Sequence, residues 1–236
     1  MDRKTLAPLL GLGLAAAGLS LRHFYRRGAL SFARPVKAPR PGEIRVACAG
    51  DSITYGYGAK PWPEASYPAR LGALLGEGYC VRNFGSSGRT AGEDGEAPYA
   101  REKLFRKSLD FRPDLVVLML GTNDTKPANW RGGGAFAGSL RGVVRAYRAL
   151  PGKPRILLAS PPPAFSGRFG VRGELLRQEL RPAVMAAAEQ EGADFLDLFA
   201  VLDGHPEWFC DGVHPNAEGA EAIAKAVCRR IKEMVS

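Results

Sequence analysis

Short apolar runs alternate with longer amphipathic stretches from residue 44 to residue 234. The apolar runs are bounded by glycine or polar positions, as is typical of strands buried on both faces of a sheet. We predict strands at residues 44–49, 79–84, 115–120, 155–159 and 194–199. The amphipathic stretches predict helices at residues 66–75, 97–110, 135–150, 173–190 and 217–234. The fourth of these helices contains Pro182, which predicts a kink or a break.

Strands that alternate with helices predict a parallel sheet with helices on both faces. We therefore expect an α/β fold, a three-layer α/β/α sandwich around a five-stranded parallel sheet. Ligands of such sheets bind at the carboxyl ends of the strands. Three predicted strands end in polar loops that contain glycine, at residues 50–58, 85–90 and 121–124. We expect these loops to converge on one site.

The N-terminus carries a separate apolar run, from Leu6 to Leu21, between basic clusters. The run is shorter than the roughly 20 residues that span a bilayer comfortably, so it fits a short membrane anchor or the core of a signal peptide. Ala15–Ala17 offers a cleavage site, whereas the basic residues at 22–27 favour the cytoplasmic side for that end. We favour an uncleaved anchor over a cleaved signal peptide. Cleavage would make the protein secreted or periplasmic. The side of the membrane stays open.

The formal net charge of +9 is concentrated in the first 40 residues, where eight Lys and Arg residues are balanced by one Asp. The rest of the chain carries only +2 and has no general electrostatic attraction to nucleic acid. We therefore exclude nucleic acid as a partner. The same boundary divides the chain into an N-terminal signal or anchor segment with a basic linker, residues 1–40, and one domain, residues 41–236.

The strand predicted at 44–49 runs directly into Gly50-Asp51-Ser52. Gly50 permits a sharp turn, and a helix that followed it would place Ser52 near its N-terminus. Unpaired backbone N–H groups and the helix dipole stabilise negative charge at that position. Ser52 is thus either a nucleophile or a helix cap, and the cap is the commoner use of such a serine. Partner residues elsewhere in the chain must decide between the two roles.

A serine nucleophile requires a base, and the chain has three histidines. His23 belongs to the basic flank of the N-terminal run, and His205 lies in a Gly-His-Pro sequence that suits a surface turn. His214 follows Asp211 by three residues, close enough for that carboxylate to orient the imidazole ring. We select His214 as the base.

Two further positions suit the stabilisation of an oxyanion. Asn123 follows the strand predicted at 115–120, where its amide can donate into a site without adding charge. Gly88 lies in the loop after the second strand, and a glycine lets its backbone N–H approach a substrate closely. The Gly-x-Ser-x-Gly turn of the α/β-hydrolases is absent from the sequence, so a different hydrolase plan is needed.

The chain resembles the SGNH hydrolase superfamily, also called GDSL esterases, through four blocks in order. They are Gly50-Asp51-Ser52, Asn83-Phe84-Gly85-Ser86-Ser87-Gly88, Gly121-Thr122-Asn123-Asp124 and Asp211-Gly212-Val213-His214-Pro215. The resemblance implies the flavodoxin-like SGNH fold and hydrolysis of carboxylic esters through an acyl-enzyme. It also implies an enzyme that needs no metal and no cofactor.

By the same resemblance, Ser52 is the nucleophile, His214 the base and Asp211 the residue that orients the base. The oxyanion hole comprises the backbone N–H groups of Ser52 and Gly88 and the side chain of Asn123. The surrounding sequence is similar to that of bacterial carbohydrate O-acetylesterases, notably at residues 82–85, 87–90 and 121–130. Side chains that suit the lining of a sugar-sized pocket, or equally packing or surface contacts, are Arg89, Trp130 and Trp62.

Three functions compete. The first is a serine esterase that removes a small acyl group, acetate, from a carbohydrate. The second is a lysophospholipase or thioesterase that the N-terminal segment places beside lipid acyl chains. The third is a binding protein that keeps the fold without catalysis, which the intact set of five site residues argues against. Preference for acyl-chain length separates the first two functions.

Overall fold

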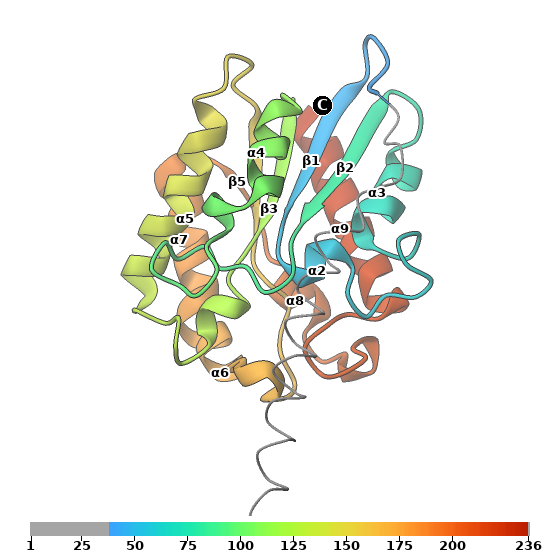
Figure 1. Ribbon diagram of the computed structural model, residues 1–236. Helices are drawn as coiled ribbons and strands as arrows, with labels where there is room; N and C mark the ends of the chain where they lie inside the picture. The colour runs from blue at the N-terminus through green and yellow to red at the C-terminus, as the bar shows by residue number, and fades with distance from the viewer. Residues whose placement is uncertain (1–37, 236) are drawn as a thin grey trace, which may run out of the picture. The chain divides into compact units, whose positions relative to one another are not determined.

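The computed structural model describes residues 38–235, in which five strands form one parallel sheet with the order β2-β1-β3-β4-β5 (Figure 1). Every neighbouring pair of strands is parallel. The strands are β1 (Ile44–Gly50), β2 (Tyr79–Gly85), β3 (Leu115–Met119), β4 (Arg155–Ala159) and β5 (Asp194–Leu196). The predicted five-stranded parallel sheet is confirmed.

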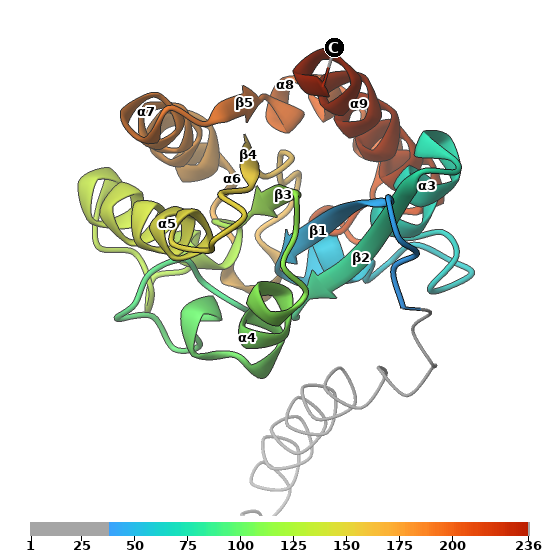
Figure 2. The ribbon, with the colours of Figure 1, turned by 90° about the horizontal axis from the view of Figure 1, so that it is seen from above.

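Helices cover both faces of the sheet and complete the predicted three-layer α/β/α sandwich (Figure 2). They are α2 (Ser52–Tyr55), α3 (Tyr67–Leu75), α4 (Lys103–Asp110), α5 (Gly133–Arg148), α6 (Gly173–Leu175), α7 (Arg181–Glu191), α8 (Leu198–Leu202) and α9 (Ala217–Val235). Successive residues of a strand point to opposite faces. On β1, Val46 and Cys48 pack in the core that α3, α8 and α9 cover, whereas Ala47 and Ala49 pack under α4, α5 and α7.

The strand order places the first loop of the site at a topological switch point. From β1 the chain continues to β2 on one side, and β3 then starts the other half of the sheet on the opposite side of β1. Loops diverge from the sheet at such a point and leave a crevice beyond the carboxyl ends of the strands. Ser52 follows the end of β1 and lies at this crevice.

The strand predicted at 194–199 is too long. β5 ends at Leu196, because Asp197 caps the following helix α8 and its Oδ1 accepts a hydrogen bond from the Ala200 N–H at 3.2 Å. The Ser160 hydroxyl accepts the N–H of Phe199 at 3.0 Å. These two acceptors satisfy donors at the start of α8, and the apolar residues after Asp197 are therefore helical.

The helix predicted at 173–190 is divided into three parts, as Pro182 suggested. A π-helical turn, Leu176–Leu180, separates α6 from α7. Proline lacks an N–H and its ring crowds the carbonyl four residues earlier, so the regular ladder opens just before Pro182.

The helix predicted at 97–110 is also interrupted. A 3₁₀ turn, Tyr99–Arg101, comes first, and Glu102 is extended before α4 begins. Tyr99 is fully buried and its hydroxyl donates to the Phe84 carbonyl at 2.7 Å. That bond fixes the turn to the end of β2, and α4 starts only after it.

Within residues 38–235, no helix has the length and apolar character needed to cross a bilayer. The apolar run from Leu6 to Leu21 and the predicted segment 1–40, except for its last three residues, lie outside the described part.

Candidate active site

Ser52 is the first residue of α2 and follows a tight turn at the end of β1. Gly50 is required there, because a Cβ atom on it would lie 2.3 Å from the Met119 carbonyl oxygen. Asp51 caps the helix through a hydrogen bond from the Ile53 N–H to Oδ1 at 2.9 Å. The sequence after β1 thus presents the Ser52 side chain from a helix N-terminus.

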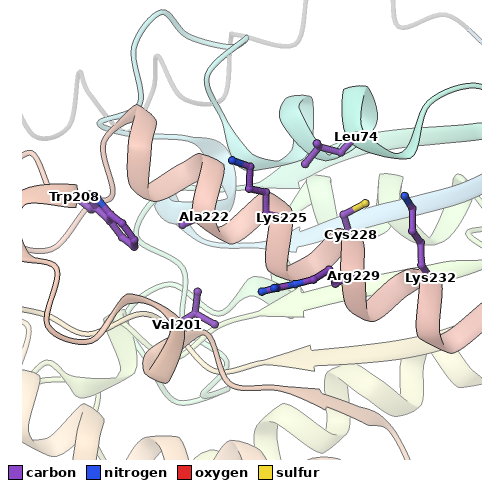
Figure 3. A pocket seen from close by; sticks show the side chains of 8 residues that line it. All are labelled: Leu74, Val201, Trp208, Ala222, Lys225, Cys228, Arg229 and Lys232. Atoms are coloured by element: carbon purple, nitrogen blue, oxygen red, sulfur yellow. The ribbon is translucent and has the colours of Figure 1, made fainter.

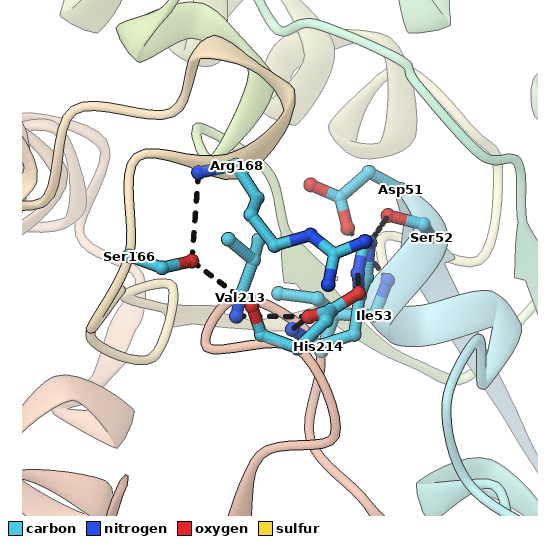
Figure 4. A network of polar contacts seen from close by, with 8 residues as sticks. Asp51, Ser52, Ile53, Ser166, Arg168, Val213 and His214 are labelled. Carbon is cyan, nitrogen blue, oxygen red and sulfur yellow. Dashed lines mark hydrogen bonds and ion pairs between the residues drawn. The ribbon is translucent and has the colours of Figure 1, made fainter.

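A continuous chain of hydrogen bonds joins the three predicted catalytic residues (Figure 4). Ser52 Oγ lies 3.0 Å from His214 Nε2, and His214 Nδ1 lies 2.8 Å from Asp211 Oδ2. The other carboxylate oxygen of Asp211 accepts the backbone N–H groups of Val213 at 2.9 Å and His214 at 2.8 Å. The carboxylate therefore fixes both the backbone and the ring of the histidine, as the three-residue spacing predicted.

The surroundings favour the neutral form of His214 and the ionised form of Asp211. Burial lowers the pKa of His214 below its ordinary value of 6.5, against the raising effect of the bond and charge of Asp211. The positive charges of Lys126 and Arg168 lower the pKa of His214 further. Burial alone would raise the pKa of Asp211, but hydrogen bonds from His214 and Val213 outweigh it and leave this pKa below 3.8. A neutral imidazole beside a hydroxyl can accept its proton.

Two backbone N–H groups face no acceptor at the site. Among residues 38–235, neither Ser52 nor Gly88 donates its backbone N–H to a protein acceptor. Gly88 has a φ of +80°, a conformation that glycine adopts without strain. Ser52 begins the helix that follows β1, and Gly88 lies in the loop that follows the neighbouring strand β2, so both groups lie near the carboxyl ends of these strands and are available as donors.

The Asn123 side chain is already hydrogen-bonded. Its Nδ2 donates to the Arg89 carbonyl at 3.1 Å and to Asp51 Oδ2 at 3.4 Å. The carbonyl of Asn123 accepts from Asn129 Nδ2 at 2.9 Å, which fixes the 3₁₀ turn that follows β3. The structure thus brings Asn123 beside the serine loop, with a short and a long hydrogen bond.

Two buried carboxylates support this arrangement, and sequence reasoning did not assign them a role. Burial raises the pKa of Asp51 to about 7 and that of Asp124 to about 6. Asp124 accepts the backbone N–H groups of Ala91 at 3.0 Å and Gly92 at 2.8 Å. It therefore joins the loop after β2 to the turn after β3. The sequence contained a signal for both carboxylates, because Asp51 is adjacent to Ser52 and Asp124 is adjacent to Asn123.

The described contacts of the two predicted substrate residues lie on the α4 and α5 side. The Arg89 guanidinium forms an ion pair with Glu102 at 2.5 Å. The Trp130 ring packs against the core on that side, with its centroid 6.4 Å from the ring of Phe136. Trp62 stacks on Tyr55 with centroids 5.0 Å apart. No hydrogen bond or ring contact joins these side chains to Ser52 or His214 in the described part of the chain.

Aromatic rings that the sequence did not single out surround the histidine. The ring centroid of His214 lies 4.4 Å from that of Tyr57 and 5.3 Å from that of Phe169. Phe169 belongs to a loop with no periodic pattern, so no local signal indicated its position. Nearly half of its surface remains exposed at the edge of the site.

A separate groove of about 450 Å³ lies on the α3 and α9 side of the molecule (Figure 3). It is bordered by Leu74, Val201, Trp208, Ala222, Lys225, Cys228, Arg229 and Lys232. None of the predicted catalytic or oxyanion residues lines it. The groove is therefore distinct from the serine site.

A model of the GDSL-like lipase/acylhydrolase family matches residues 48–222. The chain belongs to this family. The acetylxylan esterase of Xylanibacter ruminicola is 37% identical to this GDSL-like protein over 217 residues, which cover 84% of the chain. The match spans only 45% of the length of that relative.

Solved structures extend the comparison. A carbohydrate acetylesterase family member from Sinorhizobium meliloti superposes on the GDSL-like protein with a TM-score of 0.71 and 28% identity, covering 81% of this chain and 99% of the other. The aryl esterase of M. smegmatis gives a TM-score of 0.68 and 25% identity, covering 80% and 98% of the two chains. The predicted family and fold are confirmed.

Proposed function

We propose that this GDSL-like protein is a serine esterase that hydrolyses acetyl esters of carbohydrates through an acyl-enzyme. This proposal rests on the chain of hydrogen bonds that runs from Ser52 through His214 to Asp211. The cap of α2 is Asp51 and not Ser52, whose hydroxyl instead lies 3.0 Å from a buried imidazole. The geometry gives the serine a base, and the base an orienting carboxylate.

The first half of the reaction forms the acyl-enzyme. Ser52 Oγ attacks the ester carbonyl carbon while His214 Nε2 accepts the hydroxyl proton, and the carbonyl electrons move onto oxygen. We assign the stabilisation of this oxyanion to the backbone N–H groups of Ser52 and Gly88 and to the Asn123 amide. Asp211 stabilises the imidazolium that forms. As the tetrahedral intermediate collapses, His214 returns the proton to the alcohol oxygen and the C–O bond to the alcohol breaks.

The second half of the reaction releases the acid. Water then takes the place of the alcohol beside His214. The imidazole removes a proton from this water as the water oxygen attacks the acyl carbon. Collapse of the second tetrahedral intermediate returns the proton to Ser52 Oγ and releases the carboxylic acid. The same three oxyanion donors serve both steps.

Asn123 must redirect one hydrogen bond to serve as a donor. Its contact with Asp51 is 3.4 Å long, against 3.1 Å for its contact with the Arg89 carbonyl. Long hydrogen bonds are weak. An oxyanion therefore competes with Asp51, while the bond to Arg89 holds the amide in place.

The relatives support acetate as the acyl group and a carbohydrate as the alcohol. One is an acetylxylan esterase and another is a carbohydrate acetylesterase. We also assign Arg89 and Trp130 as contacts to the part of the sugar that lies away from the ester. Arg89 directly follows Gly88 in the loop after β2, and Trp130 comes after Asn123 in the segment that follows β3.

Hydrolysis of esters of graded chain length tests the proposed function. We expect acetate release from acetylated xylo-oligosaccharides and from p-nitrophenyl acetate, with slower turnover of octanoyl and palmitoyl esters and of lysophosphatidylcholine. The reverse preference would replace the proposal with a lysophospholipase or thioesterase. Turnover of no ester above the level of the Ser52→Ala variant would indicate a binding protein without catalysis.

We further propose that residues 1–40 form an N-terminal anchor or signal segment and that residues 41–236 form the catalytic domain. The apolar run and its basic flanks support association with a membrane. An intact chain in the membrane fraction is the expected result. A mature N-terminus near residue 18, with the protein outside the membrane fraction, would instead indicate a cleaved signal.

A further inference from the structure

Residues 165–172, called the strap, are fixed at one end to the loop that carries the catalytic carboxylate. The Ser166 hydroxyl donates to the Asp211 carbonyl at 2.9 Å, and the Phe165 N–H donates to the Gly212 carbonyl at 2.7 Å. Gly212 permits this close approach, because a Cβ atom on it would lie 2.6 Å from Ser166 Oγ. The start of the strap therefore has a defined position beside the catalytic loop.

The other end of the strap is fixed to the turn after β3. The backbone N–H of Arg172 donates to Thr125 Oγ1 at 3.2 Å, and its guanidinium donates to the Thr125 carbonyl at 2.5 Å. A Cβ atom on Gly170 would lie 3.9 Å from Cγ of Lys126. The strap thus joins the loop of the base to the turn that carries Asn123.

The middle of the strap places an arginine and an aromatic ring at the histidine. Phe169 has a φ of +59°, which side-chain-bearing residues rarely adopt, and its ring centroid lies 5.3 Å from that of His214. The Arg168 guanidinium carbon lies 5.5 Å from the centroid of the Phe169 ring. Figure 4 shows the Arg168 side chain extending from the strap toward Ser52 and His214. A strained residue at a site edge points to a functional constraint.

Two cations beside the reacting groups, Arg168 and Lys126, form no salt bridge among the described residues. Burial lowers the pKa of Lys126, and the charges of Asp51 and Glu96 raise it by less. The charges of Arg168 and Lys126 both act on His214, whose pKa they lower. Lys126 is half-buried, so its charge is less screened than that of a surface lysine. The site therefore has positive charge to offer a ligand.

The strap faces the alcohol part of an ester. The carbonyl oxygen of a substrate must point to the oxyanion donors in the loops after β1, β2 and β3. The alcohol oxygen must lie within reach of His214 Nε2, which protonates it. Groups that flank His214, including Arg168 and Phe169, therefore lie on the side of the alcohol and not of the acyl group.

We propose that Arg168 and Lys126 select esters whose alcohol part carries a carboxylate, such as an O-acetylated uronic acid of an acidic carbohydrate. This inference rests on the proposed function. A guanidinium on a fixed loop can bind a carboxylate through paired hydrogen bonds, and Phe169 offers its exposed ring to the apolar face of a sugar. The half-buried ammonium of Lys126 adds a second positive charge at the turn that follows Asn123.

A matched pair of substrates tests this selection. Acetate release is measured from a methyl O-acetylglucuronoside as the free carboxylate and as its neutral carboxamide. The assay is run at about pH 8, where a histidine of ordinary or lowered pKa is neutral, and at low ionic strength, where charge attraction is least screened. The enzymes are the wild type, Arg168→Gln, Lys126→Gln and Arg168→Lys. Arg106→Gln, which removes an exposed positive charge from α4, is the matched control.

The wild type should prefer the carboxylate. Arg168→Gln should lower kcat/KM for that substrate about tenfold, the size of one charge-assisted hydrogen bond, and lower it much less for the carboxamide, which carries no charge. Lys126→Gln should act in the same direction, Arg168→Lys should keep most of the preference, and Arg106→Gln should change nothing. Equal losses on both substrates, or no loss on either, would overturn the inference.

The same assay separates failure of this inference from failure of the proposed function. If Ser52-dependent turnover is found only with p-nitrophenyl acetate or with neutral acetylated sugars, the esterase stands and the selection of acidic alcohols is wrong. If no acetyl ester is hydrolysed above the level of Ser52→Ala, the proposed function itself is wrong, and the inference falls with it.

Discussion

At the scale of single residues, Asn123 is the proposed oxyanion donor that a substitution can remove most cleanly. Its amide has no charge, and its contacts are to the Arg89 carbonyl and to Asp51. We predict that Asn123→Ala lowers kcat for p-nitrophenyl acetate by about 10²- to 10³-fold, because one donor to the transition state is lost.

The far-ultraviolet circular dichroism and melting temperature of Asn123→Ala serve as controls, since the Asn123 side chain also links two loops. A folded variant whose kcat stays within a few-fold of the wild type would refute the assignment of the amide to the oxyanion hole.

The histidine predicts the pH dependence. Burial, with Lys126 and Arg168, lowers the pKa of His214 below 6.5. We propose that His214 is the base, and an imidazole accepts a proton only when neutral. The value of kcat/KM should therefore fall on acidification with a midpoint below 6.5. The measurement is a pH–rate profile on a neutral acetyl ester. A midpoint above 6.5 would show that the imidazolium is stabilised in the free enzyme, contrary to the structure.

At the scale of elements, the turn from β1 into α2 contains the buried carboxyl group of Asp51. Burial disfavours the ionised form of this group. The pKa of Asp51 is raised from 3.8 to about 7. The unfolded chain releases this proton near pH 4, whereas the folded protein keeps it until about pH 7. The free energy of unfolding contributed by Asp51 therefore falls between these two values as the pH rises.

Asp51→Asn removes this dependence and keeps an acceptor for the Ile53 N–H. We predict that its free energy of unfolding, relative to wild type, is higher at about pH 7.5 than at about pH 4.5 in urea titrations. Asp110→Asn, which removes an exposed carboxylate on α4, is the matched control. A relative free energy that is independent of pH, or that falls as the pH rises, would show that Asp51 is ionised throughout.

Elements were predictable where their signal is local. Central strands such as β3 are buried on both faces and appear as uninterrupted apolar runs. The end of β5 was missed because the capping role of Asp197 depends on where the next helix packs. The strap could not be predicted, since its position depends on hydrogen bonds to Asp211, 45 residues from Ser166, and to Thr125, 47 residues from Arg172.

At the scale of the whole molecule, the site exists only in the folded chain. Ser52 and His214 are 162 residues apart and meet because the sheet brings the ends of its strands together. The sequence blocks predicted this meeting and the pairing of Asp211 with His214. They did not predict that Arg168 and Phe169 would join the site, since neither lies in a block that resembles the family.

The boundary near residue 40 is also testable at this scale. β1 begins at Ile44, so every strand and helix of the described part starts after residue 40. We predict that a protein starting at Pro41 unfolds cooperatively and keeps the kcat/KM of the full chain on a soluble acetyl ester. Loss of cooperative unfolding would show that residues 1–40 are part of the folded unit.

The role of Ser52 as the nucleophile is tested by the rate of p-nitrophenyl acetate hydrolysis by the wild type and by Ser52→Ala, purified in the same way. Loss of the nucleophile should lower kcat by at least about 10³-fold, because the remaining groups only bind and polarise the ester. The variant should keep the wild-type melting behaviour within a few degrees. A kcat for Ser52→Ala within tenfold of the wild type would show that Ser52 is not the nucleophile.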